Sequence, residues 1–229
     1  MAYPTLDEAV EWRIPVWKPA VESTLTRAAG ILPPAATVLE IGYNSGMMSC
    51  YMAGRYGWHV IGYDIRSEAA QEACDNALRY GVNDLCEFRT CLPEDTLAIT
   101  GPFDAVFLKS VLYHIADVSL YRRWLDWLHG VLSDTGVVMA VENGAGGMLD
   151  RLYRKVIRRS RWADFLLFDR WAEAEFNKTF RSVDMRYFGR VSQFFIHQPA
   201  AFSLVRRVEA RFFPPDADHC FVAAIVARK

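Results

Sequence analysis

The residues most suited to chemistry surround two glycines in the first quarter of the chain. In residues 38–48, VLEIGYNSGMM, a short β-branched run leads into a turn that holds Gly42 and Gly46, and helical apolar spacing follows. A strand that feeds a glycine-bearing turn and then a helix places backbone N–H groups at the carboxyl edge of a sheet, where ligands bind. The pattern E-x-G-x-N-x-G, which begins at Glu40, therefore predicts a cofactor loop.

The spacing within this loop excludes two common nucleotide sites. A dinucleotide fingerprint, G-x-G-x-x-G, requires glycine where the chain has Met47, and no Gly-Lys-Ser/Thr follows to form a phosphate-binding Walker loop. Asp64 ends the next predicted strand, 22 residues after Gly42. A carboxylate at that point can accept two hydrogen bonds at once, as the hydroxyls of a ribose require.

Asn44 stands where such loops carry their middle glycine. Asparagine and aspartate are the non-glycine residues that adopt a positive φ most readily, so Asn44 predicts a working loop rather than a decayed one. Two roles stay open for its amide: it either only tolerates the turn or also contacts the cofactor.

Together with later motifs, this loop resembles the first motif of class I S-adenosylmethionine-dependent methyltransferases. The further matches are FDAVFLKSVLYHIAD at 103–117, LSDTGVVMAVEN at 132–143 and the last apolar run at 220–229. The resemblance covers about residues 35–143 and 200–229. It implies an α/β fold with a doubly wound, Rossmann-like, seven-stranded and mostly parallel sheet, closed by an antiparallel C-terminal hairpin of residues 202–213 and 220–229.

The resemblance also implies S-adenosylmethionine as the cofactor. The positions expected to contact it are Glu40, Gly42, Tyr43, Asn44, Gly46, Asp64, Ile65, Cys91, Leu92 and Lys109. The turn after the third strand, RTCLPED, departs from the family because it lacks a clear acid for the adenine amino group. Backbone atoms around Cys91 and Leu92, or the side chains of Glu94 or Asp95, are the alternatives.

Methyl transfer from a sulfonium is an in-line displacement, which needs an aligned nucleophile and, for a hydroxyl, a base. His114 follows the fourth strand and is expected to be that base, since imidazole titrates near neutrality; the alternative is a histidine that orients the turn. Tyr113, Glu142 and Asn143 are expected to face the acceptor, although Glu142 could instead bind exposed backbone N–H groups. His197 is more consistent with packing.

The elements that must position these residues alternate along the chain. Strands are predicted at 37–42, 59–64, 85–90, 103–109 and 137–143, helices at 47–57 and 67–82, and a helix followed by a turn at 121–136. Ser67 is expected as an N-cap and Gly81 as a helix end. Near-continuous apolar strands between helices predict a parallel sheet that is buried on both faces.

Two segments interrupt this alternation within what we expect to be a single domain, 1–229. Residues 1–34 carry Trp12, Arg13, Trp17 and Lys18, and form either a lid over the cofactor or a helix packed on the sheet. Residues 144–190 are expected to form a helical cap insertion before the sixth strand. Their basic amphipathic part, 149–171, either contacts an anionic membrane or covers the active site with its arginines in water.

Composition limits the class of partner. The chain has 229 residues, 52% of them hydrophobic, and a formal net charge of −1, so no overall field selects nucleic acid. Five scattered cysteines without a CxxC pair predict a reducing, cytoplasmic setting and no metal site. The N-terminal residues lack a signal-peptide pattern, and no apolar run is long enough to cross a bilayer.

These patterns predict methyl transfer from S-adenosylmethionine to a hydroxyl of a small molecule, such as a natural product, a sugar or a lipid-linked acceptor. An amine or a lipid head group is the near alternative. A second class of hypothesis is a non-catalytic cofactor-binding protein on the same fold. The sequence does not predict an oligomeric state.

Overall fold

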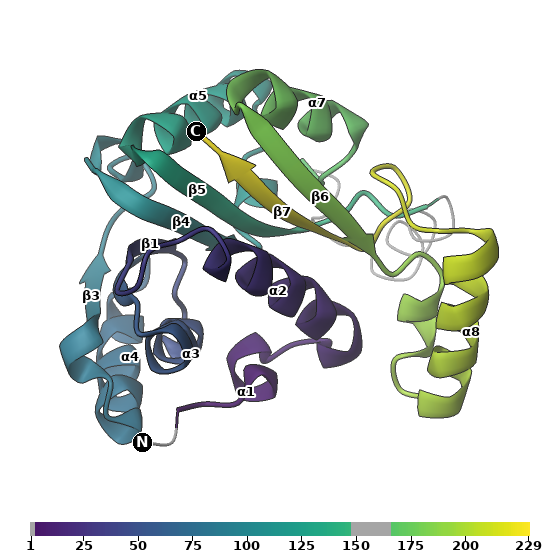
Figure 1. Ribbon diagram of the computed structural model, residues 1–229, viewed down its shortest axis with the longest axis horizontal. Helices are drawn as coiled ribbons and strands as arrows, with labels where there is room; N and C mark the ends of the chain where they lie inside the picture. Colours follow the sequence, from purple (N-terminus) through teal and green to yellow (C-terminus); the bar gives the residue numbers. More distant parts are fainter. Residues whose placement is uncertain (1–2, 148–165) are drawn as a thin grey trace.

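One seven-stranded sheet organises the protein, of which a computed structural model describes residues 3–147 and 166–229 (Figure 1). The strand order is β3-β2-β1-β4-β5-β7-β6. The strands are β1 (Thr37–Ile41), β2 (His59–Asp64), β3 (Cys86–Thr90), β4 (Phe103–Lys109), β5 (Leu132–Asn143), β6 (Ser182–Phe188) and β7 (Val222–Arg228). β7 runs antiparallel to both of its neighbours, and the other pairs are parallel. The order reverses between β1 and β4, which is where α/β sheets bind ligands.

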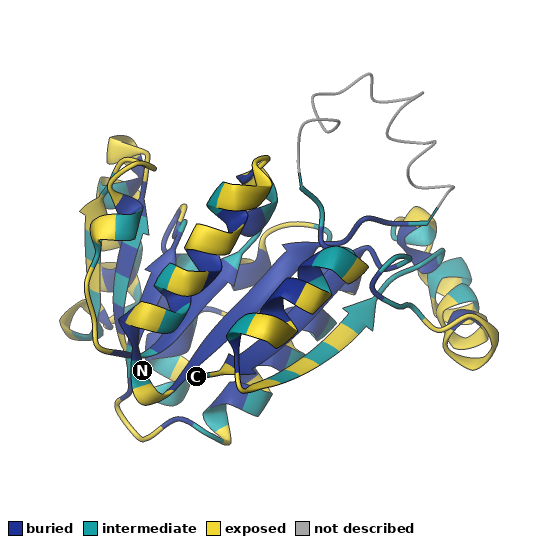
Figure 2. Ribbon diagram, turned by 90° about the horizontal axis from the view of Figure 1, so that it is seen from above, coloured by how far each residue is buried: buried dark blue, intermediate teal, exposed yellow. Residues whose placement is uncertain are grey.

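Helices cover both faces of this sheet. The helices are α1 (Leu6–Val10), α2 (Ile14–Ala29), α3 (Met47–Tyr56), α4 (Ser67–Tyr80), α5 (Val118–Val131), α7 (Arg170–Thr179) and α8 (Pro199–Phe212), with short 3₁₀ turns η1 (Asn83–Leu85), η2 (Thr96–Ala98), η3 (Leu112–His114) and η5 (Ser192–Phe195). One core cluster joins α2 and α3 to the sheet, and the second joins α5 and α7 to its other face. The central strands are accordingly buried, while the helices turn exposed sides outward (Figure 2). This confirms the predicted fold class.

Helix ends follow mostly from local sequence. Gly81 ends α4 at a φ of 64°, as predicted, and the side chain of Asp117 caps α5 by accepting the N–H of Leu120. The expected N-cap at Ser67 is wrong, because the N-cap residue is Arg66 and Ser67 lies in the first turn of α4, where its hydroxyl bonds Glu68.

The C-terminal hairpin has different members from those expected. Residues 202–213, predicted as its first strand, belong largely to helix α8, so that assignment is wrong. The antiparallel neighbours of β7 are β5 and β6 instead, with Asn143 opposite Val222. Proline in the first helical turn and inward residues Phe202, Val205 and Glu209 at helical spacing explain the helix.

The range 144–190 is only partly a helical insertion. Its described residues include α7 but also β6, so the sixth strand begins earlier than expected. Most of the basic run 149–171 lies outside the described residues, which exclude 148–165.

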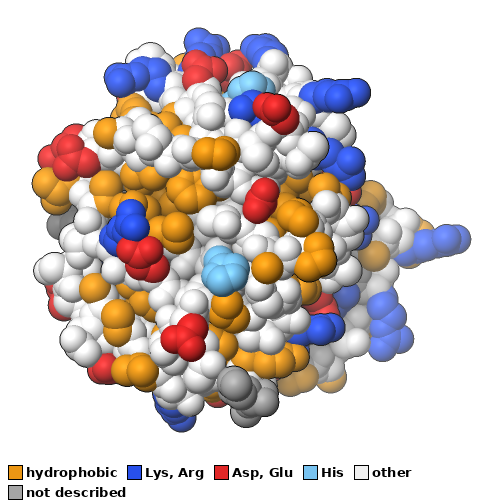
Figure 3. All heavy atoms as spheres, turned by 60° about the vertical axis from the view of Figure 1, so that its left-hand side comes forward, with side chains coloured by type: hydrophobic (Ala, Val, Ile, Leu, Met, Phe, Trp, Pro, Cys, Tyr) orange, Lys and Arg blue, Asp and Glu red, His pale blue; other side chains and the backbone are white. Residues whose placement is uncertain are grey.

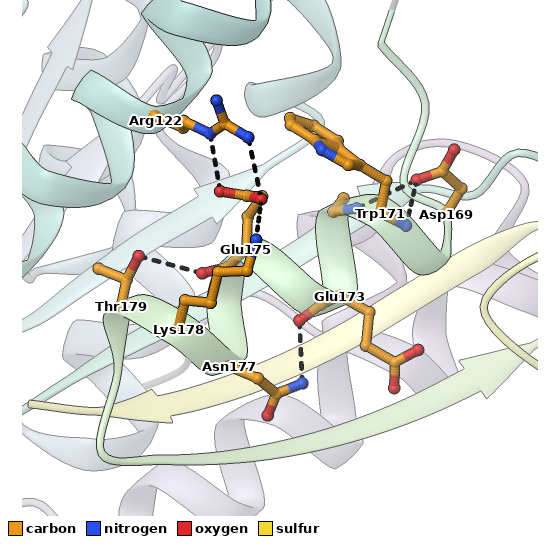
Figure 4. A network of polar contacts seen from close by, with 9 residues as sticks. Arg122, Asp169, Trp171, Glu173, Glu175, Asn177, Lys178 and Thr179 are labelled. Atoms are coloured by element: carbon orange, nitrogen blue, oxygen red, sulfur yellow. Dashed lines mark hydrogen bonds and ion pairs between the residues drawn. The ribbon is translucent and has the colours of Figure 1, made fainter.

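Helix α7 is fixed to α5 by one buried carboxylate (Figure 4). Glu175 accepts hydrogen bonds from Arg122 Nε at 2.9 Å and Nη2 at 3.2 Å, and from Lys178 Nζ at 2.7 Å. These two cations hold the pKa of Glu175 down at about 2. The arrangement is a charge-assisted clamp between two helices on the same face of the sheet.

The N-terminal segment packs against the body of the protein. Trp17 is buried where α2 contacts the sheet, in agreement with the packed-helix alternative. The Arg13 guanidinium lies 5.0 Å from the ring centre of Trp12 and 4.9 Å from that of Phe221, and Lys18 pairs with Asp7. A lid role for residues 1–34 stays a prediction.

Candidate active site

A cavity of about 840 Å³ opens at the carboxyl edge of β1, β2 and β4, a size typical of small-molecule sites. Six of the residues expected from the sequence line it: Gly42, Asp64, Ile65, Cys91, Lys109 and His114. They come from four different strand ends, and the sheet brings them together at its switch point.

The cofactor loop turns on three residues with positive φ. Gly42, Asn44 and Gly46 have φ angles of 79°, 51° and 73°. A Cβ on Gly46 would lie 2.6 Å from the Cβ of Ala73, so the loop also packs too closely on α4 for any side chain. The middle position therefore requires the left-handed conformation, in which asparagine replaces glycine with least strain.

The amide of Asn44 is engaged by the protein. Its Nδ2 donates to Glu11 Oε2 at 3.1 Å, and its Oδ1 accepts from Arg66. The hydroxyl of Ser45 also donates to Glu11. Asn44 thus connects the segment after α1 with the start of α4, across the top of the loop.

Asp64 is buried at the end of β2, where it fixes the loop and keeps free capacity. Its Oδ2 accepts the N–H of Asn44 at 2.9 Å, and its Oδ1 accepts the N–H of Arg66 at 3.0 Å. Arg66 Nε also lies 3.7 Å from Oδ1. An ionised carboxylate offers about four lone-pair sites, so Asp64, which lines the cavity, can accept further hydrogen bonds.

Two further predicted residues, Glu40 and Lys109, tie neighbouring segments to the site. Glu40 is buried beneath the loop, where it accepts from the Ser49 hydroxyl, and burial raises the pKa of Glu40 to about 7. Lys109 lines the cavity and donates to the carbonyl of Val10 at 3.0 Å. Burial lowers the pKa of Lys109, and the nearby carboxylate of Glu11 opposes that shift.

His114 lies in turn η3, where its partly exposed side chain lines the cavity. Its ring centre lies 3.9 Å from that of Tyr113. Partial burial of the imidazole lowers the pKa of His114, which favours the neutral form at physiological pH. Neutral imidazole is the form that accepts a proton.

The three residues expected to face the acceptor do not line this cavity. Glu142 is buried, and its Oε1 accepts the N–H groups of Val111 and Leu112, both at 3.0 Å, which is the alternative role considered for it. Burial raises the pKa of Glu142 to about 7. Asn143 donates to Ser110 Oγ at 3.1 Å. Glu142 and Asn143 therefore hold the turn that carries Tyr113 and His114.

Five expected cofactor contacts are not among the residues that line this cavity: Glu40, Tyr43, Asn44, Gly46 and Leu92. The Tyr43 ring is buried against Phe88, with ring centres 4.9 Å apart, because its side chain points toward α4 and β3. Leu92 is exposed. Of the two acids considered after β3, Glu94 lines the cavity, whereas Asp95 does not.

Sequence reasoning missed Arg66, Arg123 and Trp124, which line the cavity. Arg66 is the N-cap residue of α4, and the other two lie in the second turn of α5. His219, which does not line the cavity, lies just before β7, where its Nδ1 is 2.8 Å from Asp216 Oδ1. The antiparallel direction of β7 places that loop at the same edge as the end of β5. The sequence feature that could have drawn attention to His219 is D-A-D-H directly ahead of an apolar strand.

The face of the protein on the β3 side carries charges of both signs (Figure 3). On the β3 side of the protein, apolar, acidic and basic side chains are interspersed (Figure 3). Within residues 3–147 and 166–229, no three metal-ligating side chains cluster. No helix in those same ranges is long and apolar enough to cross a membrane.

Comparison with known proteins identifies the family. Residues 13–185 match a family model described as a methyltransferase domain, and this match covers most of the chain. The chain belongs to this methyltransferase family. The resemblance to class I S-adenosylmethionine-dependent methyltransferases is thereby confirmed, and S-adenosylmethionine is the cofactor that the family uses.

Among curated proteins, this methyltransferase is similar to part of two plant enzymes. It is 32% identical over 101 residues to phosphoethanolamine N-methyltransferase 1 of Zea mays, a match that covers 42% of this chain and 19% of the relative. It is 28% identical over 98 residues to phosphoethanolamine N-methyltransferase 1 of Arabidopsis thaliana, with 42% and 20% covered. The match thus spans about a fifth of the length of each relative.

Solved structures confirm the fold. Haemonchus contortus phosphoethanolamine N-methyltransferase 2, in complex with phosphomonomethylethanolamine and S-adenosylhomocysteine, has a TM-score of 0.63 and 16% identity, with 90% of this chain and 52% of that chain covered. Geranyl diphosphate C-methyltransferase from Streptomyces coelicolor A3(2) has a TM-score of 0.64 and 13% identity, with 93% and 79% covered. At such identities the likeness shows the fold alone.

Proposed function

We propose that this methyltransferase transfers a methyl group from S-adenosylmethionine to the amine nitrogen of a small molecule. The observation that carries the proposal is that Gly42, Asp64 and His114 line one cavity. The amine is preferred because the curated relatives are named as N-methyltransferases. The hydroxyl acceptor expected from the sequence is the second candidate, supported by the same histidine.

The cavity fits the cofactor in the chemistry of its lining. Asp64 would bind the ribose hydroxyls, Glu94 would meet the adenine amino group, and Ile65, Leu97 and Trp124, which also line the cavity, would offer apolar surface to the adenine ring. When bound, S-adenosylmethionine supplies a methyl group activated by its sulfonium. The backbone around Gly42 would contact the methionine portion.

His114 is the proposed base. Its lowered pKa leaves the imidazole neutral at physiological pH, so it can take a proton from an ammonium or a hydroxyl group at the cavity. For an amine, loss of that proton frees the nitrogen lone pair for attack. Glu142 is a positioning residue in this proposal, because it fixes the turn that bears His114.

Arg123 supports an acceptor that carries an anionic group. This residue lines the same cavity as His114 and is exposed in the second turn of α5. A guanidinium can bind two oxygens of a phosphate at once, which suits a phosphorylated amine such as the one that the curated relatives are named for.

Calorimetry tests the cofactor assignment before any acceptor is known. Asp64→Asn is expected to weaken binding of S-adenosylmethionine and of S-adenosylhomocysteine at least about tenfold, since the amide replaces one acceptor oxygen with a donor. Asp84→Asn, an exposed change in η1, is the matched control and is expected to bind normally. Unchanged affinity in Asp64→Asn contradicts the ribose assignment.

Formation of S-adenosylhomocysteine with a panel of acceptors tests the reaction. Phosphoethanolamine and unphosphorylated amines are compared with hydroxyl compounds of similar size, and turnover with an amine is expected. Turnover only with hydroxyl compounds favours the second candidate. Cofactor binding without turnover on any acceptor supports a non-catalytic binding protein instead.

A further inference from the structure

Helix α8 stands apart from the sheet and its covering helices. In Figure 1 it lies at the far side of β6 from the main body, and its neighbour in the chain, η5, is its chief contact. Figure 2 shows that much of its surface is exposed. Only Glu209 is buried along this helix, so most of its side chains face away from the core.

The single acidic residue of α8, Glu209, faces inward and is hydrogen-bonded there. Glu209 accepts the backbone N–H groups of Arg190, Val191 and Ser192 at 2.9, 2.7 and 2.8 Å. These bonds fix the helix to the loop after β6. The exposed charges that remain on the helix are those of Arg206, Arg207 and Arg211.

The outward face is apolar. Leu204, Val208 and Phe212 recur every four residues and are 61%, 44% and 67% exposed. Phe213, the residue that follows the helix, is 59% exposed. A surface helix normally turns such a stripe toward the core and its polar residues toward water. Here a second apolar stripe faces solvent, beside Arg207 and Arg211, which marks an interaction surface.

We propose that this outer face of α8 docks on an anionic lipid membrane. Apolar side chains would enter the interface while Arg207 and Arg211 extend to the lipid phosphates, the arrangement of interfacial amphipathic helices. A second copy of the chain is a poorer occupant, because the exposed charges of α8 are all basic and the helix offers no exposed acid to pair with the arginines of a partner copy. The inference does not depend on the proposed methyl transfer.

Vesicle co-sedimentation tests the proposal. The full chain is mixed with phosphatidylcholine vesicles that contain either no anionic lipid or about one third phosphatidylserine, at low and high salt. Wild type is expected to bind the anionic vesicles, and less well at high salt. The double change Leu204→Ser with Phe212→Ser is expected to lower the binding constant at least about tenfold. Arg207→Gln with Arg211→Gln is expected to reduce binding to anionic vesicles only.

The control is Leu78→Ser, since Leu78 is 63% exposed on α4, away from this face. It should bind like wild type, and calorimetry with S-adenosylhomocysteine should show every variant folded. Absence of wild-type binding, or equal loss in the Leu78 variant, overturns the proposal. The proposal is also overturned if vesicle binding is lost only when the basic run 151–159 is substituted. Sedimentation velocity that finds a dimer dependent on Leu204, without lipid binding, assigns the face to self-association instead.

Discussion

At the scale of single residues, the backbone and the amide of Asn44 serve different parts of the cofactor loop. The backbone adopts a φ of 51°, and the amide connects Glu11 to Arg66. Asn44→Gly keeps the conformation and is expected to lower the free energy of unfolding by about 1 kcal/mol or less. Asn44→Val places a branched side chain in the left-handed region, with an expected loss of about 2 kcal/mol. Urea denaturation of both variants measures the difference, and equal stabilities would contradict the backbone requirement.

The two histidines at this edge of the sheet allow the base assignment to be tested. With an acceptor that the enzyme methylates, His114→Asn is expected to lower kcat about a hundredfold or more, whereas His219→Asn should have a small effect on kcat. Because the pKa of His114 is lowered, its neutral form persists to mildly acidic pH. The wild-type rate is expected to fall only as pH drops below the ordinary histidine range, and His114→Asn should lack that acid limb. The reverse ranking of the two variants would assign the base to His219 and its partner Asp216.

Sequence alone could place the site but not the contacts within it. The loop glycines, Asp64 and His114 follow from strand ends and spacing, because parallel strands must meet at one edge. The role of Glu142 does not follow from the sequence, since it depends on how residues 111–112 fold back over the end of β5. The direction of the Tyr43 side chain depends likewise on the packing of α4.

At the scale of elements, Glu175 determines how α7 meets α5. Its pKa of about 2 lies below the ordinary value, so the clamp contributes stability above the unfolded pKa that is lost as pH falls toward 2. Glu175→Gln is expected to be less stable than wild type at neutral pH and to lose less stability between about pH 4.5 and pH 2. Thermal unfolding across this range measures the effect, with exposed Glu72→Gln as the control. If the stability of wild type and of Glu175→Gln changes with pH in parallel, the proposed stabilising role of the Glu175 clamp is excluded.

Helices and strands could be predicted from the sequence where the spacing of their buried apolar residues is typical of that type of element. The central parallel strands β1, β4 and β5 are buried on both faces and read as nearly continuous apolar runs, so the middle of the sheet was evident from the sequence. Helix α8 was mistaken for a strand because apolar residues lie on two of its sides. Phe202 and Val205 face inward while Leu204 and Val208 face outward, and this combination hides the helical period.

At the scale of the whole molecule, two buried carboxyls couple stability to pH. Glu40 and Glu142 lie under the cofactor loop and under the His114 turn, and burial raises the pKa of each to about 7. The folded protein therefore holds these protons more tightly than the unfolded chain. This contribution to stability is full below the unfolded pKa, about 4.5, and is lost as pH rises through about 7.

Glu142→Gln is expected to remove part of this dependence. The glutamine oxygen can still accept the N–H groups of Val111 and Leu112, but the residue no longer titrates. Between about pH 4.5 and pH 7, the free energy of unfolding should fall less steeply with pH in the variant than in wild type. The difference between the two slopes is expected to reach about 1.4 kcal/mol per pH unit. Urea denaturation at several pH values measures both slopes, and Glu72→Gln, an exposed change, should retain the wild-type slope. Identical slopes in all three proteins would mean that Glu142 is ionised throughout, held by the backbone N–H groups strongly enough to overcome its burial.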